Sequence, residues 1–249
     1  MFKTSNPVFK EEYFSGQGAY AAVGGNTMTI GGTITKTFVL LGIVFIAGMY
    51  TWDMYASGAG DRAMGLVFLG VIGGFITAII TCFAKHLAMI TAPIYAALEG
   101  LALGAFSAIF NARYSGIVIQ AVVLTIAVLA IMLAAYKTGI IRPTQRFATG
   151  VISATGAICL YYLISMFGGF FGFQMPLIHS NGLFGIIFSV IIVGIAALNL
   201  ILDFAFIEMG ERNGSPKYLE WYGAFSLIVT LVWLYLEILR LLSKINSRN

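Results

Sequence analysis

The sequence has few charged residues for its length. Of 249 residues, 14 are Lys or Arg and 10 are Asp or Glu. Charged residues therefore make up 10% of the chain, against about 25% in a typical soluble domain. Apolar residues make up 59%, and the mean hydropathy is +0.93. This composition excludes an ordinary soluble enzyme and a disordered chain, and it predicts a helical protein that crosses a membrane several times.

Cysteine and histidine are also scarce. Cys82 and Cys159 are the two cysteines, and His86 and His179 are the two histidines. They share no metal-ligand spacing and form no cluster, which argues against a disulfide framework and against a structural zinc site. We expect both cysteines to be small buried residues, and the sequence predicts no cofactor.

The sequence contains several long apolar runs. A helix needs about 20 apolar residues to cross the hydrocarbon core of a bilayer. The runs lack an alternating pattern, which favours helices over a β-barrel. The predicted fold is therefore all-α, with a polar N-terminal tail at 1–36 and a seven-helix transmembrane domain at 37–249. The seven predicted spans are 37–56, 64–83, 87–110, 116–136, 147–167, 183–207 and 222–242.

Basic residues are distributed unevenly between the two sides of this topology. The N-terminal tail and the loops after the second, fourth and sixth spans hold Lys3, Lys10, Lys36, Lys85, Lys137, Arg142, Arg146, Arg212 and Lys217. The other loops hold Arg62 and Arg113. The positive-inside rule then predicts a cytoplasmic N-terminus and, with seven spans, an external C-terminus. Six or eight spans would instead bring the basic C-terminal tail inside.

Carboxyl groups within the apolar runs are the strongest functional signal. A charge at the centre of a membrane helix costs about 2.5–3.5 kcal/mol on insertion scales, so such residues are rare without a use. Glu99 lies near the middle of the third span. Gly100 and Gly104 beside it have the spacing that lets another helix approach closely. We expect Glu99 either to bind an ion or proton or to pack as a neutral acid.

Asp203 and Glu237 lie in the sixth and seventh spans. Asn199 precedes Asp203 by one helical turn, on the same face. Arg240 follows Glu237 by three residues, so either the two form an intrahelical ion pair or Glu237 faces the bundle and titrates with a second acid. Two acids held close in the interior cannot both ionise easily. Protonated, they would hold helices together, and deprotonated they would offer oxygens to Ca²⁺, which predicts a pH-sensitive cation leak.

Three segments resemble the Bax inhibitor-1 family, also called the transmembrane Bax inhibitor motif family. They are ALEGLALG in the third span, ILDFAFIE in the sixth and LYLEILRLL in the seventh, and they occur in this order. The opening SNPVFKEE is similar to the bacterial YccA-like branch. This resemblance extends over nearly the whole chain. It implies six helices wrapped around a central seventh and a location in the bacterial inner membrane.

The resemblance also implies a function and a site. Members are associated with a pH-sensitive calcium leak whose sensor is a pair of acids, matched here by Asp203 and, in place of a second Asp, Glu237. Both would also be transient calcium ligands. The resemblance implies a gating role for a basic residue at the end of the second helix, for which Lys85 is the nearest candidate.

The spacing of the two sensor acids departs from the family pattern. Asp203 and Glu237 are 34 positions apart, farther than in the better-known members. Either 218–225 includes structure that does not span the membrane, or the two acids do not touch. In the second case Glu99 is the best substitute partner.

A second interpretation is a non-transporting regulator that binds a membrane protease or another membrane complex, as the YccA-like branch is thought to do. It predicts that the polar tail carries the activity and that acid-to-amide changes leave function intact. We do not expect an enzyme, because no Ser-His, Cys-His or HExxH arrangement is present. The basic residues serve topology, so no nucleic-acid partner is predicted. The oligomeric state stays open.

Overall fold

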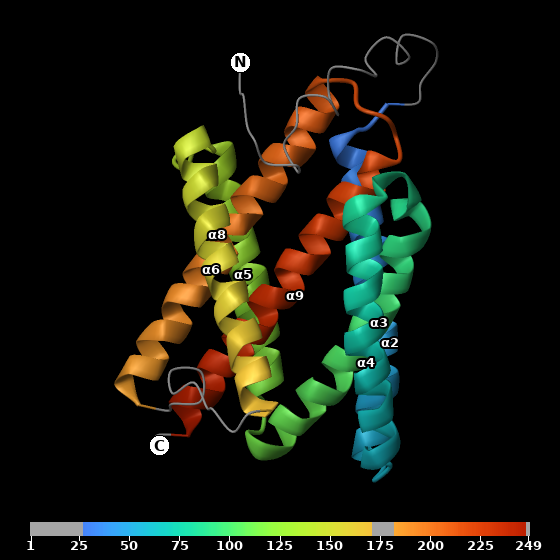
Figure 1. The fold of residues 1–249 in the computed structure, drawn as a ribbon, viewed down its shortest axis with the longest axis vertical. Helices are drawn as coiled ribbons and strands as arrows, with labels where there is room; N and C mark the ends of the chain where they lie inside the picture. Colours follow the sequence, from blue (N-terminus) through green and yellow to red (C-terminus); the bar gives the residue numbers. More distant parts are fainter. Residues whose placement is uncertain (1–26, 171–181, 248–249) are drawn as a thin grey trace. The chain divides into compact units, whose positions relative to one another are not determined.

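The computed structural model describes residues 27–170 and 182–247 (Figure 1). Most of the predicted polar tail, residues 1–26, therefore lies outside the described residues, as do His179 and its neighbours. The helices are α2 (Ile30–Ala56), α3 (Gly60–Phe83), the short 3-10 helix η2 (Lys85–Leu87), α4 (Ala88–Arg113), α5 (Ile117–Lys137), α6 (Gln145–Phe170), α8 (Leu183–Arg212) and α9 (Leu219–Asn246).

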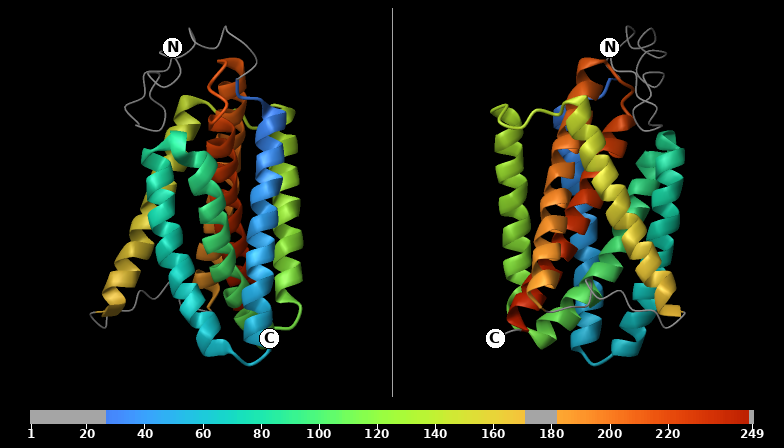
Figure 2. Two further views of the ribbon diagram at one scale, coloured as in Figure 1. Left: turned by 90° about the vertical axis from the view of Figure 1, so that its right-hand side faces the viewer. Right: turned by 60° about the vertical axis from the view of Figure 1, so that its left-hand side comes forward.

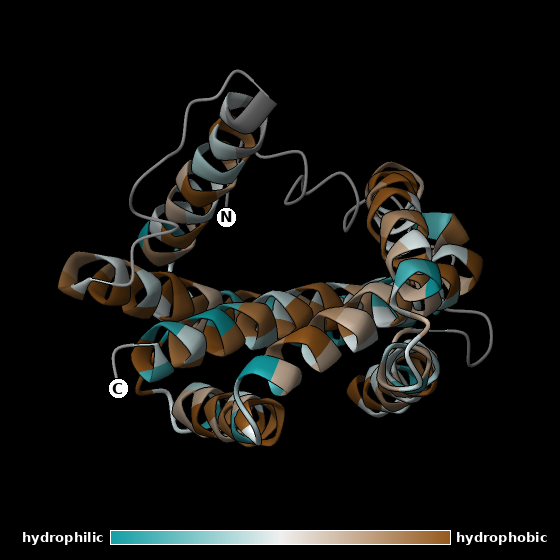
Figure 3. Cartoon of the chain, turned by 90° about the horizontal axis from the view of Figure 1, so that it is seen from below, coloured by the Kyte–Doolittle hydropathy of each residue, from teal (hydrophilic) through white to brown (hydrophobic). Residues whose placement is uncertain are grey.

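The structure confirms the predicted all-α class with seven candidate spans. Among the described residues, seven helices are long and apolar enough to cross a membrane. Hydrophobic residues, brown in Figure 3, predominate along these helices. Within the described residues, β structure amounts to an isolated bridge between Thr27 and Pro216. The architecture is that of a multi-pass membrane protein.

Three details differ from the predictions. The first long helix begins at Ile30 and not at Thr37, so Lys36 belongs to a helix and not to the tail. α9 begins at Leu219, three residues before the predicted seventh span, and continues to Asn246. Cys82 and Cys159 are free, but both are exposed, and the prediction that they are buried was wrong. A thiol is apolar enough to lie on the outer face of a spanning helix.

The chain divides into two compact units. Unit 1 consists of Met1–Ile109 and Ala205–Ile228, and unit 2 of Phe110–Phe204 and Val229–Asn249. Since the boundary falls inside α4, α8 and α9, each of these helices contributes to both units.

In unit 1, α2, α3 and α4 lie side by side (Figures 1 and 2). A Cβ atom at Gly100 of α4 would lie 2.5 Å from the carbonyl oxygen of Val44 in α2 and 2.9 Å from Cβ of Ala47. A Cβ at Gly104 would overlap the backbone of Gly48 and the hydroxyl of Thr51. The close helix approach predicted from the two glycines is therefore confirmed, and its partner is α2.

The start of α2 is fastened to the connection between α8 and α9. The backbone N–H of Met28 donates to the carbonyl of Ser215 over 2.7 Å, and the N–H of Ile30 donates to the Glu211 carboxylate over 2.9 Å. Met28 is 1% exposed. The bond from Ile30 satisfies one of the amides that the first turn of a helix leaves without intrahelical partners.

Glu220 completes this attachment, which we call the N-terminal clasp (27–36 with 211–220). Its carboxylate accepts from the N–H and the hydroxyl of Thr29, each over 2.9 Å, and it pairs with Lys36. Lys217 lies 3.9 Å away. Glu220 is 0% exposed, so the clasp buries an ion pair between the first and last spanning helices. This pairing explains why α2 begins before the apolar run does.

Candidate functional site

The strongest cluster of polar side chains in unit 2 surrounds Glu237 on α9. Glu237 is 1% exposed. Its Oε1 accepts from the hydroxyl of Tyr162 over 2.8 Å and from the indole N–H of Trp233 over 3.3 Å. Nη1 of Arg240 donates to both carboxylate oxygens, over 2.8 and 2.9 Å. Oε1 thus accepts from three donors, and the intrahelical ion pair that the sequence offered as one alternative is present.

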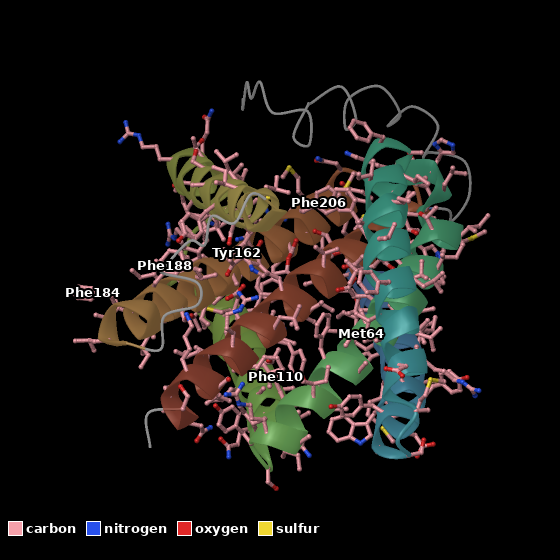
Figure 4. All side chains as sticks on the ribbon, turned by 60° about the horizontal axis from the view of Figure 1, so that its bottom comes forward. Met64, Phe110, Tyr162, Phe184, Phe188 and Phe206 are labelled. Atoms are coloured by element: carbon pink, nitrogen blue, oxygen red, sulfur yellow. The ribbon has the colours of Figure 1, made fainter. Side chains whose placement is uncertain are left out.

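Arg240 is held by α6 as well as by its own helix. Its Nη1 donates to the hydroxyl of Tyr162 over 2.6 Å, and its guanidinium lies 5.2 Å from the centre of the Tyr162 ring. Tyr162, labelled in Figure 4, thus donates to the acid and accepts from the base. Three side chains therefore form a closed, charge-balanced set that connects α6 to α9.

Asp203 lies on α8 and is 7% exposed. Asn199, one turn earlier, donates its amide to the hydroxyl of Thr155 on α6 over 2.8 Å and to the carbonyl of Ile195 over 2.9 Å. Thr155 and Tyr162 are seven residues apart and share a face of α6. One face of α6 therefore supplies a hydroxyl to each of the two acid-bearing helices.

The two predicted sensor acids are not hydrogen-bonded to each other. In the part of the chain that the structure describes, the partners of Glu237 are Tyr162, Trp233 and Arg240, and Asp203 is not among them. This agrees with the alternative in which the two acids do not touch. The tyrosine that meets Glu237 is 75 residues away in sequence, and no local pattern pointed to it.

Lys244 lies beyond the last predicted span, yet its side chain is buried. It is 4% exposed and donates to the carbonyl of Gly185 over 3.1 Å and to the hydroxyl of Ser189 over 2.9 Å, both on α8. Its position two turns after Glu237 and one turn after Arg240 places all three on one face of α9. This spacing in the sequence is the signal that predicts a shared face for the three residues.

The remaining predicted residues, Glu99 and Lys85, lie in unit 1. Glu99 of α4 faces Gly74 of α3, where a Cβ would lie 3.1 Å from Oε2 of the acid. Lys85 belongs to η2, and its ammonium lies 5.0 Å from the centre of the Tyr222 ring on α9. Neither residue belongs to the cluster around Glu237.

A resident metal centre is not apparent in residues 27–170 and 182–247. They contain no group of three or more His, Cys, Asp or Glu side chains that could hold a metal ion. The expectation for calcium was a transient contact with Asp203 and Glu237, and it stays a prediction.

Comparison with known proteins places the chain in a family. A family model described as Bax inhibitor 1 like matches residues 6–247. Searches among curated proteins and among solved structures found no match. The family match runs through the three segments that carried the resemblance, and the YccA-like branch stays a prediction. The chain, a membrane protein with seven candidate spans, belongs to the Bax inhibitor 1 like family.

Proposed function

We propose that this protein is a pH-sensitive leak for cations, with Ca²⁺ as the permeant ion, gated by Asp203 and Glu237. The observation that carries the proposal is the burial of both carboxyl groups, 7% and 1% exposed, within unit 2. Intramembrane acids are costly, and they mark ion and proton pathways more often than they serve packing alone. Family membership supports a membrane function of this kind.

The contacts of Glu237 suggest how such a gate would work. Arg240 occupies both oxygens of Glu237, so a cation that binds this carboxylate must displace the guanidinium. Protonation of Glu237 would remove the charge that attracts Arg240. Either change would loosen the link between α9 and Tyr162 of α6. We propose the release of this link as the opening step.

The proposal includes a location and an orientation. The distribution of Lys and Arg supports a cytoplasmic N-terminus, and the resemblance to the YccA-like branch implies the bacterial inner membrane. The arrangement of six helices around a central seventh, which the family resemblance implies, stays a prediction. The lipid bilayer would then be the principal partner.

The test is calcium flux into dye-loaded proteoliposomes at several pH values on both sides of neutrality. We expect a pH-dependent flux in the wild type and a changed pH profile in Asp203→Asn and Glu237→Gln. Glu208→Gln is the matched control, because Glu208 is 31% exposed and pairs with Arg212 at the end of α8. It should keep the wild-type profile.

The alternative function makes the opposite prediction. A regulator that binds a membrane protease or another membrane complex would show no flux above empty vesicles at any pH while remaining folded. It would keep its activity in both acid-to-amide variants and lose it when 1–26 are deleted. That set of results would overturn the leak.

A further inference from the structure

A second set of polar residues follows the contact between α3 and α4 in unit 1. Four buried hydroxyl groups lie along it, and none takes part in the site around Glu237. The residues, with their exposed fractions, are Thr77 at 8%, Thr81 at 0%, Thr91 at 8% and Tyr95 at 6%. We call this set the hydroxyl seam.

The two helices meet in a regular antiparallel register. Gly74 faces Glu99, and Thr81 faces Thr91, so the seam begins beside the acid and ends beside η2. Eight residues separate Thr91 from Glu99, which corresponds to about 12 Å of helix rise. The seam therefore extends from the η2 end to the middle of the span.

The half-buried Glu99 has no ionic partner among the described residues. In the described residues, no hydrogen bond or ion pair involves its carboxyl group, and Oε2 faces the backbone at Gly74. α2 approaches α4 at the neighbouring Gly100 through Val44 and Ala47, which carry no charge. An ionised carboxylate in such a place is far more costly than a carboxylic acid, so a proton is the ligand that fits.

The hydroxyl groups of the seam form a route along which a proton can reach Glu99. The hydroxyl of Thr81 lies 2.8 Å from the hydroxyl of Thr91 and 2.7 Å from the carbonyl of Thr77, and its single proton is donated to one of the two at a time. Bonds from threonine to its own helix are common in membrane helices, but the Thr81–Thr91 bond joins two helices. A hydroxyl group can both donate and accept a hydrogen bond, as a relay requires.

We propose that Glu99 is a proton-binding site of unit 1, reached from the η2 end through the hydroxyl seam. A proton from water at that end adds to a carboxylate oxygen of Glu99 and leaves a carboxylic acid, and release reverses the step. The titratable groups near the route are Tyr95 on α4, Cys82 on α3 and Lys85 in η2. This site is separate from Asp203 and Glu237 and does not depend on the leak.

Infrared spectroscopy of the full-length protein in liposomes tests the site. We expect a carbonyl-stretch band of a protonated carboxyl group that is lost in Glu99→Gln and kept in Asp203→Asn and Glu237→Gln. A band unaffected by Glu99→Gln would overturn the proposal. If Glu99→Gln does not fold, Gly74→Ala replaces it, because the new methyl group would lie 3.1 Å from Oε2 and should shift the band. An unshifted band would then overturn the proposal.

The exchange rate of the same proton tests the route. After transfer to D₂O the band should shift as the proton is replaced, and Thr81→Val combined with Thr91→Val should slow that shift several-fold. The matched control is Thr125→Val, because Thr125 is also buried and bonds its own helix, but it lies on α5 in unit 2. Equal rates in all three proteins would overturn the seam as the route.

Discussion

At the scale of single residues, two arginines with similar local sequence have different surroundings. Arg240 pairs with Glu237 three residues earlier, and Arg212 pairs with Glu208 four residues earlier. The acid is 2% exposed in the first pair and 31% exposed in the second. Exposed ion pairs contribute about 0–1 kcal/mol, whereas breaking a buried pair costs about 3–5 kcal/mol because a charge is left uncompensated. Burial, which local spacing does not reveal, separates the two.

This difference predicts the effect of removing each arginine. Arg240→Met should lower the free energy of unfolding by about 3–5 kcal/mol, and Arg212→Met by about 0–1 kcal/mol. Reversible unfolding of the protein in detergent micelles would measure both. Adding Glu237→Gln to Arg240→Met should restore much of the loss, because no buried charge remains. Equal losses for the two arginine variants would show that the Glu237 pair is not effectively buried.

At the scale of helices, glycine placement determines how closely two spans approach. Gly104 and Gly100 of α4 meet the backbone of α2 directly, whereas a Cβ at Gly42 of α2 would have no neighbour within 4 Å. Small residues in this pattern let membrane helices pack through their backbones. The sequence predicted the close approach, but not that α2 is the partner.

Alanine substitutions should separate the two kinds of glycine. Gly104→Ala should destabilise the protein by about 1–3 kcal/mol or more, because its methyl group would overlap the backbone of Gly48. Gly42→Ala should be neutral or stabilising by up to about 1 kcal/mol, since it only restricts the unfolded chain. Thermal unfolding of both variants, followed by circular dichroism, would measure this. A Gly104→Ala protein as stable as Gly42→Ala would contradict the close contact.

The start of α2 is a helix boundary that the apolar runs of the sequence do not reveal. Thr29 and Lys36 are polar, so hydropathy placed the helix start at Thr37. Glu220, 191 residues after Thr29, supplies the acceptor that lets the helix begin at Ile30. A helix boundary determined by so distant a residue is not visible in the local sequence.

At the scale of the whole molecule, an odd number of spans places the two termini on opposite sides of the membrane. Seven candidate spans predict this, and the positive-inside rule predicts which terminus is cytoplasmic. Ser5→Cys and Ser247→Cys, each in a protein with Cys82→Ala and Cys159→Ala, would report the side. A membrane-impermeant maleimide should label Ser5→Cys only in inverted vesicles and Ser247→Cys only in right-side-out vesicles. Labelling of both from one side would require six or eight spans.

Fold class, number of spans and family membership could all be read from the amino-acid sequence. The bilayer imposes the first two, because each crossing needs about 20 apolar residues whose backbone bonds are internal to a helix. The sequence also identified Glu99, Asp203 and Glu237 as unusual, since a charge in an apolar run is visible without any partner, and it offered the Glu237–Arg240 pair, which helical spacing makes local.

The contacts that these acids make depend on how the helices pack, which the sequence does not show. Helical spacing shows which residues share a face, but it does not show which other helix that face meets. Tyr162 reaches Glu237 across 75 residues of sequence, and Gly74 of a neighbouring helix faces Glu99. Asp203 and Glu237, whose contact the sequence left open, are not hydrogen-bonded to each other in the described residues, because α9 presents Glu237 to its own arginine and to a tyrosine of α6.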